Sequence, residues 1–224
     1  MANDLQRWTA VDDYLNERLV PPDPALDGAL RDSEAAGLPA IQVTPTMGKL
    51  LHLLARVQGA RRILEIGTLG GYSTIWLARA LPAGGRVVTL EFEARHADVA
   101  RANLKRAGLA DVVDLRLGRA LDTLPKLQAE GGAPFDVVFI DADKQSNPEY
   151  FQWALKLSRV GSVIIVDNVI RDGAVIDADK REPAIEGVRR LNQMLGTEPR
   201  VSATALQTVG AKGYAGFALA VVIA

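Results

Sequence analysis

The chain contains no cysteine among its 224 residues. Disulfide scaffolds, thiolate zinc sites and cysteine nucleophiles are therefore excluded, and a reducing compartment is compatible with the sequence. Histidine is nearly as scarce, with His52 among leucines and His96 in a charged helical segment. Neither has the sequence neighbours of a catalytic triad or a metal cluster, so we expect both to be structural.

The sequence also lacks an excess of charge of either sign. Lysine and arginine number 26 against 27 aspartates and glutamates, so the net charge is -1. That balance gives no electrostatic reason to expect a nucleic acid or an anionic membrane as partner. Residues 1–19 carry charges throughout and lack the apolar core of a signal peptide or membrane span. We therefore expect a cytoplasmic protein whose partner is a small molecule.

No repeat, low-complexity tract or long linker divides the chain, so we expect one domain over residues 1–224. Residues 1–60 predict a helical region, with helices around Trp8 to Val20, through Ala36 and from Thr44 onward. Thr44 is suited to cap the third helix, because its hydroxyl can accept a hydrogen bond from a free backbone N–H and Pro45 fits the first helical position.

After residue 61 short β-rich runs alternate with helical segments, which is the pattern of a mostly parallel α/β sheet with crossover helices. The expected strands are Arg62 to Ile66, Arg86 to Leu90, Val112 to Leu117, Phe135 to Ile140 and Ser162 to Val166. The expected helices are Tyr72 to Ala80, Ala94 to Ala107, Ala120 to Leu127, Pro148 to Leu157 and Pro183 to Met194. Two final runs, Val201 to Gln207 and Gly216 to Val222, flank a turn at 210–213 and predict a terminal antiparallel hairpin.

A glycine-rich turn follows the first strand, and an acidic residue ends the second. The turn contains Gly67, Thr68, Gly70 and Gly71 and leads to Ser73 near a helix start, and Glu91 lies 26 positions after Glu65 (91 minus 65). A carboxylate at that strand end can accept both hydroxyls of a ribose, so the two features together predict a nucleoside site. The simpler alternative is a tight strand-to-helix turn with no ligand.

A nicotinamide oxidoreductase shares the glycine turn and the acidic strand end. Position 69 is leucine, so G-x-G-x-x-G is not formed. The carboxylate of Glu65 would repel a pyrophosphate but would tolerate a cationic sulfonium. The spacing therefore favours a sulfonium nucleoside, although a dinucleotide enzyme and a non-catalytic nucleoside-binding protein stay open as alternatives.

Oxygen ligands follow the fourth and fifth strands, as Asp141, Asp143 and Lys144 on one and Asp167 with Asn168 on the other. Carboxylate and amide oxygens suit Mg²⁺, with Mn²⁺ and Ca²⁺ as alternatives. A cation held by Asp141, Asp167 and Asn168 keeps open positions for an acceptor with two adjacent oxygens, and we expect Asp143 to point away. The other interpretation is that the acids end strands, cap helices or pair with Lys144.

These motifs, in this order and spacing, make the chain resemble the cation-dependent O-methyltransferases related to catechol and caffeoyl-CoA O-methyltransferase, in their plant and bacterial branch. The resemblance implies the Rossmann-like class I methyltransferase fold, with S-adenosylmethionine as cofactor, a phenolic acceptor of catechol type and a homodimer. The residues that it assigns to the cofactor are Val43, Glu65, Gly67, Thr68, Ser73, Glu91, Ala120 and Asp141. It also assigns Asp141, Asp167 and Asn168 to the metal, and Lys144 to the role of general base.

For Lys144 an ion-pair role stays open, because a free lysine has a pKa of about 10.4 and the neighbouring acids favour its charged form. The acceptor pocket is expected to be shaped by the helical region 1–60 and by the loop after Asn168. Trp8, Met47 and Arg171 are its candidate border residues. The identity of the acceptor has no motif in the sequence.

Overall fold

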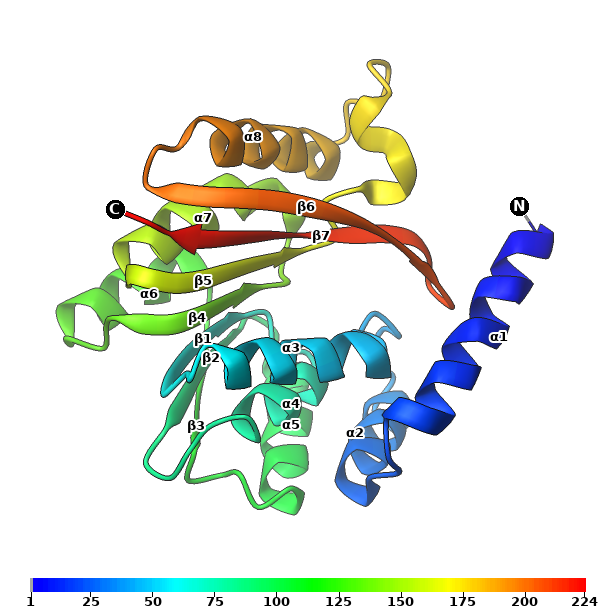
Figure 1. Cartoon of the computed structure of the whole chain (residues 1–224). Helices are drawn as coiled ribbons and strands as arrows, with labels where there is room; N and C mark the ends of the chain where they lie inside the picture. The colour runs from blue at the N-terminus through cyan, green and yellow to red at the C-terminus, as the bar shows by residue number, and fades with distance from the viewer. Residues whose placement is uncertain (1) are drawn as a thin grey trace.

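The computed structural model describes residues 2 to 224 as a seven-stranded sheet with helices on both faces (Figure 1). The strands are β1 (Arg62–Ile66), β2 (Arg86–Glu91), β3 (Val113–Leu117), β4 (Phe135–Ile140), β5 (Ser158–Asp167), β6 (Val201–Gly210) and β7 (Gly213–Val222). Their order across the sheet is β3-β2-β1-β4-β5-β7-β6. The first five strands pair in parallel, whereas β7 runs antiparallel to both β5 and β6. The predicted Rossmann-like sheet with a C-terminal hairpin is thereby confirmed.

The α-helices are α1 (Ala2–Leu19), α2 (Pro24–Ala35), α3 (Pro45–Val57), α4 (Tyr72–Ala78), α5 (Ala94–Arg106), α6 (Ala120–Ala129), α7 (Asn147–Lys156) and α8 (Pro183–Thr197). Two short 3-10 segments, η1 (Lys144–Ser146) and η2 (Arg171–Ile176), follow β4 and β5. In Figure 1, α3, α4 and α5 lie on one side of the sheet, and α6, α7 and α8 lie on the other. None of the helices within residues 2–224 is long and apolar enough to cross a membrane.

Alternate side chains of the central strands enter two separate cores. Leu64 and Ile66 of β1 pack into the core under α6, α7 and α8, whereas Ile63 packs into the core under α3 and α4. Phe139 and Val137 of β4 join the second core in the same way. A parallel strand buried on both faces needs an unbroken apolar run, which is why these strands could be recognised in the sequence.

The starts of the amino-terminal helices follow the expected local chemistry. Thr44 caps α3, since its hydroxyl accepts the Met47 N–H at 3.3 Å. Asp23 caps α2 by accepting from the N–H groups of Ala25 and Leu26 at 3.0 and 3.1 Å. At the tip of the hairpin, the Asp12 carboxylate of α1 accepts the Ala211 N–H at 2.7 Å, so α1 lies beside the β6–β7 turn (Figure 1).

Several expected boundaries differ from the structure, and the differences are clearest in β5, the terminal hairpin and α1. Strand β5 begins at Ser158 rather than Ser162, because Ser158 pairs with Phe135 of β4. The register of the ladder then shifts between Phe135 and Val137. The hairpin strands extend to Gly210 and from Gly213, so only residues 211 and 212 form the turn. Helix α1 begins at Ala2, before the expected start at Trp8.

Candidate active site

The ends of β1 and β4 approach each other so closely that only glycine fits between them. The Asp141 N–H donates to the Ile66 carbonyl at 2.8 Å. A Cβ built on Gly67 would lie 2.2 Å from the Asp141 carbonyl oxygen, and Gly67 has φ of +100°, which side chains rarely adopt. The position therefore requires glycine on two independent grounds. The switch point of the sheet, between β1 and β4, thus brings the predicted nucleoside turn against the predicted cation ligand.

A cavity of about 650 Å³ opens at this edge of the sheet. Nine of the residues predicted for the site line it, namely Val43, Gly67, Thr68, Ser73, Glu91, Ala120, Asp141, Lys144 and Asn168. Two predicted residues, Glu65 and Asp167, do not line this cavity.

The Glu91 carboxylate organises the glycine turn from within. Its Oε2 accepts the N–H groups of Thr68 and Leu69 at 3.1 and 2.7 Å, and its Oε1 accepts the Glu93 N–H at 2.9 Å. His96 Nδ1 lies 3.4 Å from the same Oε1. A carboxylate has about four acceptor directions, and the three N–H groups take three of them, so the fourth is shared between His96 and any ligand in the cavity.

Glu65 lies beneath the cavity floor, where it is fully buried. Its carboxyl group accepts hydrogen bonds from Ser73 Oγ at 2.6 Å, from Thr89 Oγ1 at 2.7 Å and from the Thr74 hydroxyl. Burial raises the pKa of Glu65 to about 7, against the opposing effect of the three hydroxyls. The sequence predicts Glu65 in the methionine part of the cofactor site, which stays a prediction; in the structure its carboxyl group reaches the cavity only through Ser73, whose hydroxyl donates to it.

Asp141 and Asp167 leave neighbouring strands at the same level. Ile140 is paired with Val166 in the parallel ladder, so the next residue of each strand is one of these aspartates. Burial, followed by the charge of Asp141, raises the pKa of Asp167 to about 6. Two half-buried carboxylates that repel each other are the arrangement that a bound cation relieves.

The residues around these aspartates fit a hard divalent cation. Asp167 Oδ1 accepts the Asn168 N–H at 2.8 Å, which leaves Oδ2 free of protein donors in the described residues. Asp141 Oδ1 accepts from Lys144 Nζ at 2.6 Å, so Lys144 takes the ion-pair position. Across residues 2–224, acids and histidines do not gather in threes at metal-binding spacing. A cation at the two aspartates would take the Asn168 amide as its third protein ligand, and this ligand set stays a prediction.

Asp143 takes no part in this cluster. Its two oxygens accept the hydroxyls of Tyr150 and Ser146, and those bonds hold the carboxylate on the side of α7. Burial and the Asp143 charge in turn raise the pKa of Tyr150 above its usual range. The expectation that Asp143 points away from the cation ligands agrees with these contacts.

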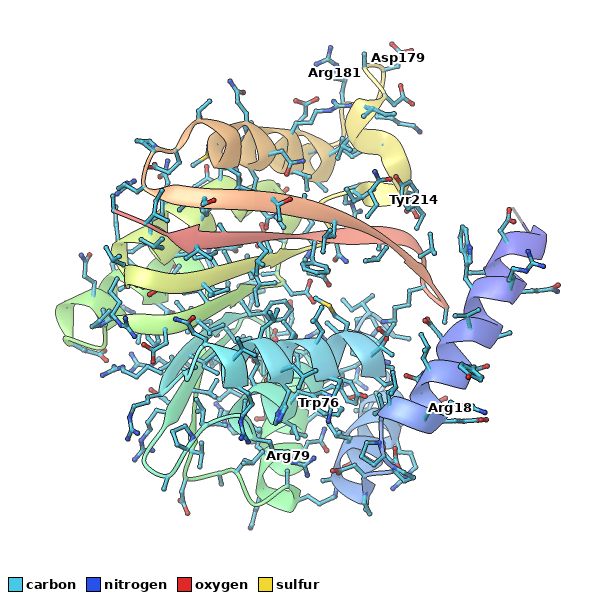
Figure 2. All side chains as sticks on the ribbon, in the orientation of Figure 1. Arg18, Trp76, Arg79, Asp179, Arg181 and Tyr214 are labelled. Atoms are coloured by element: carbon cyan, nitrogen blue, oxygen red, sulfur yellow. The ribbon has the colours of Figure 1, made fainter. Side chains whose placement is uncertain are left out.

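A second cavity of about 640 Å³ adjoins the first. Both are lined by Ile41, Gln42, Val43, Asn168 and Arg171, so these residues form the shared wall. Asp167 and Met47 line only the second cavity, together with Lys212 and Tyr214 of the β6–β7 hairpin. Tyr214 lies where the hairpin meets η2 (Figure 2). Of the three candidate border residues, Met47 and Arg171 line this cavity and Trp8 lines neither.

Several lining residues were not predicted for the site, including His96, for which only a structural role is expected from the sequence. Phe92 is 63% exposed and His96 lies four positions later in α5, and both line the first cavity. An exposed aromatic directly after an acidic strand end was the signal available in the sequence. Lys212 and Tyr214 had no such signal, since their place depends on how the hairpin packs against residues 40–43.

Comparison with known proteins identifies the family. The family model described as O-methyltransferase matches residues 24–213. The chain belongs to the O-methyltransferase family. It is 57% identical over 212 residues to a catechol O-methyltransferase of Mycobacterium tuberculosis, covering 95% of this chain and 94% of the relative.

Two solved members have nearly the same fold. An O-methyltransferase from Bacillus cereus in complex with SAH is 60% identical, with a TM-score of 0.96 over 97% of this chain and 99% of that one. The O-methyltransferase TomG from Streptomyces achromogenes, involved in tomaymycin synthesis, was solved with SAM. It is 54% identical, with a TM-score of 0.95 over 98% of this chain and 99% of that one. The enzyme is thus an S-adenosylmethionine-dependent O-methyltransferase, and the nicotinamide and non-catalytic alternatives are set aside.

Proposed function

We propose that the enzyme methylates one of two adjacent hydroxyl groups on a small aromatic acceptor, with a divalent cation held by Asp141, Asp167 and Asn168. The observation that carries this proposal is the distribution of the three ligands over the two cavities. Asp141 lines the first cavity, Asp167 lines the second, and Asn168 lines both. A cation bound by all three therefore lies at the junction, within reach of groups in either cavity.

The first cavity is proposed to hold S-adenosylmethionine. Glu91 would bind the ribose by accepting a hydroxyl in its remaining direction, and the exposed ring of Phe92 beside it would cover the adenine. Gly67, Thr68 and Ser73 would line the methionine part, with Val43 and Ala120 contacting the nucleoside, and Glu65 would fix the Ser73 hydroxyl from behind. Relatives bound to SAM and SAH support this assignment.

The second cavity is proposed to hold the acceptor. Residues 40–47, from the helical region 1–60, form one wall of it, and the loop after Asn168 forms another. The name of the catechol O-methyltransferase relative supports an acceptor with vicinal hydroxyls. The homodimer and the cytoplasmic location stay predictions.

Methyl transfer requires the acceptor oxygen and the S-methyl group to be held in line, which is a matter of position more than of covalent catalysis. The shared wall 41–43 and Arg171 fix the distance between the two bound molecules. When bound, a divalent cation supplies Lewis-acid stabilisation of the ionised hydroxyl.

Lys144 is the proposed proton acceptor, placed at the junction by its bond to Asp141. Lys144→Ala should then lower kcat by at least about 100-fold while the dissociation constant for S-adenosylmethionine stays the same. Rapid-quench turnover together with calorimetric titration would measure both. Near-normal turnover would leave Lys144 only its ion-pair role.

The proposal is tested by product analysis with three matched acceptors. Methylcatechol has adjacent hydroxyls, methylresorcinol has separated ones, and cresol has one. With S-adenosylmethionine and Mg²⁺ we expect mass spectrometry to detect a monomethylated product from methylcatechol alone, and a chelator should lower that rate at least about 100-fold.

Each part of the proposal has its own contradicting result. A rate indifferent to chelator would refute the cation mechanism, and equal methylation of methylresorcinol would refute chelation by vicinal hydroxyls.

A further inference from the structure

Lys212 is the basic residue that the β6–β7 turn presents to the acceptor cavity. It lines the second cavity and not the first, whereas Lys144 lines the first and not the second. Its Nζ donates to the carbonyl of Gln42, and the Ala40 carbonyl lies 3.5 Å away. The turn is held in place from its other side by the bond between Asp12 and the Ala211 N–H. The ammonium is therefore held at the cavity by these carbonyls, although Lys212 as a whole is an exposed residue.

The charge of this ammonium has no direct counter-ion. Carbonyl oxygens accept hydrogen bonds but carry no net charge, and within the described chain no carboxylate lies at ion-pair distance from Lys212. Burial lowers the pKa of Lys212, while the more distant charges of Asp141 and Asp167 raise it. Those two aspartates are the proposed cation ligands, so a bound divalent cation would cancel their attraction for the ammonium.

The other charged residues on the cavity are Arg171, Asp12 and Asp172, besides Asp167. One Asp12 oxygen is already used by the Ala211 N–H, and Asp172 is exposed to solvent. Arg171 adds a second cation, and its buried Nε has no hydrogen-bond partner in the described residues. With the cation site filled, Lys212 and Arg171 line this cavity as cations that no carboxylate of the described residues approaches to ion-pair distance.

We propose that Lys212 binds an anionic substituent of the acceptor, so that the preferred substrates are vicinal diphenols that carry a carboxylate. This inference rests on the proposed function and names the substrate class of the same site. Lys212 is a specificity residue here. It would contact the end of the acceptor away from the reacting hydroxyls, because the two hydroxyls bind the cation.

The test compares three catechols that differ in the charge of one substituent. Protocatechuate carries a carboxylate, methylcatechol is neutral, and dopamine carries an ammonium. We expect the wild type to show a kcat/KM for protocatechuate about tenfold above that for methylcatechol, and still lower values for dopamine. In Lys212→Met the ratio of protocatechuate to methylcatechol should fall about tenfold through KM, and Lys212→Arg should restore it.

Lys126→Met is the matched control, since this exposed lysine on α6 lines neither cavity. Its ratio should equal that of the wild type. Calorimetric titration of protocatechuate into the protein with S-adenosylhomocysteine and Mg²⁺ gives a second measurement that needs no turnover, and Lys212→Met should weaken that binding about tenfold.

An unchanged ratio and unchanged binding in Lys212→Met, or a preference for dopamine, would overturn the inference. Metal-dependent methylation of methylcatechol by the wild type reports separately on the proposed function. If that reaction is present while the Lys212 effect is absent, only the inference is wrong. If the reaction is absent, the calorimetric titration still decides the role of Lys212.

Discussion

Glu65 is a carboxyl group enclosed by three hydroxyl groups and the apolar core. In such a place the protonated form is favoured, so the pKa rises from 4.5 to about 7. Between these two values the folded protein binds more protons than the unfolded chain. The free energy of unfolding should therefore decrease as the pH rises through this interval, by up to about 3 kcal/mol.

Glu65→Gln removes this titration, so we expect its free energy of unfolding to decrease less steeply than that of the wild type from about pH 4.5 to about pH 7. Asp167, with a pKa raised to about 6, leaves part of the slope in both proteins. Urea unfolding at a series of pH values measures the difference. The exposed Glu34→Gln serves as control and should retain the wild-type slope. Parallel curves for Glu65→Gln and the wild type would contradict the burial argument.

Single residues could be predicted for the site where the sheet itself dictates their place. Asp141 directly follows β4, and Glu91 and Asp167 are the last residues of β2 and β5; parallel strands bring their carboxyl ends to one edge. The orientation of the Glu65 side chain could not be predicted, because a shift of one residue at the end of a strand decides whether a side chain faces the cavity or the core. The position of Lys212 at the cavity could not be predicted for another reason. Its neighbours Ala40 and Gln42 are 172 and 170 positions away along the chain.

At the scale of the elements, the turn between β1 and α4 depends on glycine at one position above all. A methyl group on Gly67 would collide with backbone of the Asp141 turn, which cannot move without breaking the β1–β4 pairing. Gly59 has a positive φ of +65° as well, but an added Cβ there meets nothing within 4 Å. Comparing alanine at Gly59 with alanine at Gly67 therefore separates the backbone strain of a positive φ from the steric clash with the Asp141 backbone.

Gly59→Ala should lower the free energy of unfolding by about 1 kcal/mol, which is the strain of a left-handed non-glycine residue. Gly67→Ala should lower it by several times as much, roughly 3 kcal/mol or more, and should weaken S-adenosylmethionine binding. Urea unfolding and calorimetric titration of the two variants measure these effects. An equal decrease in the free energy of unfolding of the two variants would show that the close approach of Gly67 to Asp141 does not contribute to stability.

The elements themselves were predictable where composition and period agree. Apolar runs bounded by turn residues gave β1 and β4 with their observed ends. The predicted boundaries were wrong where pairing with a neighbouring strand extends an element, as in β5 and the two hairpin strands. Their added residues pair with a neighbour that the sequence alone does not reveal. The 3-10 segment η2 was also missed, since Arg171 holds a positive φ that arginine rarely adopts.

For the whole molecule, the order of the strands explains how two cavities come to share one wall. Strands β2 and β3 lie on one side of β1, and β4 and the later strands lie on the other, so the strand order reverses between β1 and β4. The antiparallel β7 places the hairpin turn over the edge where β5 ends. Residues 40–43 close the remaining side by contact with Lys212. A cation at Asp141, Asp167 and Asn168 would occupy the meeting point of these four parts of the chain.

The most direct measurement is a titration of Mn²⁺ into the protein, followed by electron paramagnetic resonance of the free ion. It compares the wild type with Asp167→Asn and with Asp179→Asn, whose side chain lies in the exposed loop before α8, at the far end of η2 (Figure 2). We predict the same Kd for the wild type and Asp179→Asn, and a Kd at least about tenfold higher for Asp167→Asn. An equal affinity in all three proteins would contradict a cation site at the junction of the two cavities.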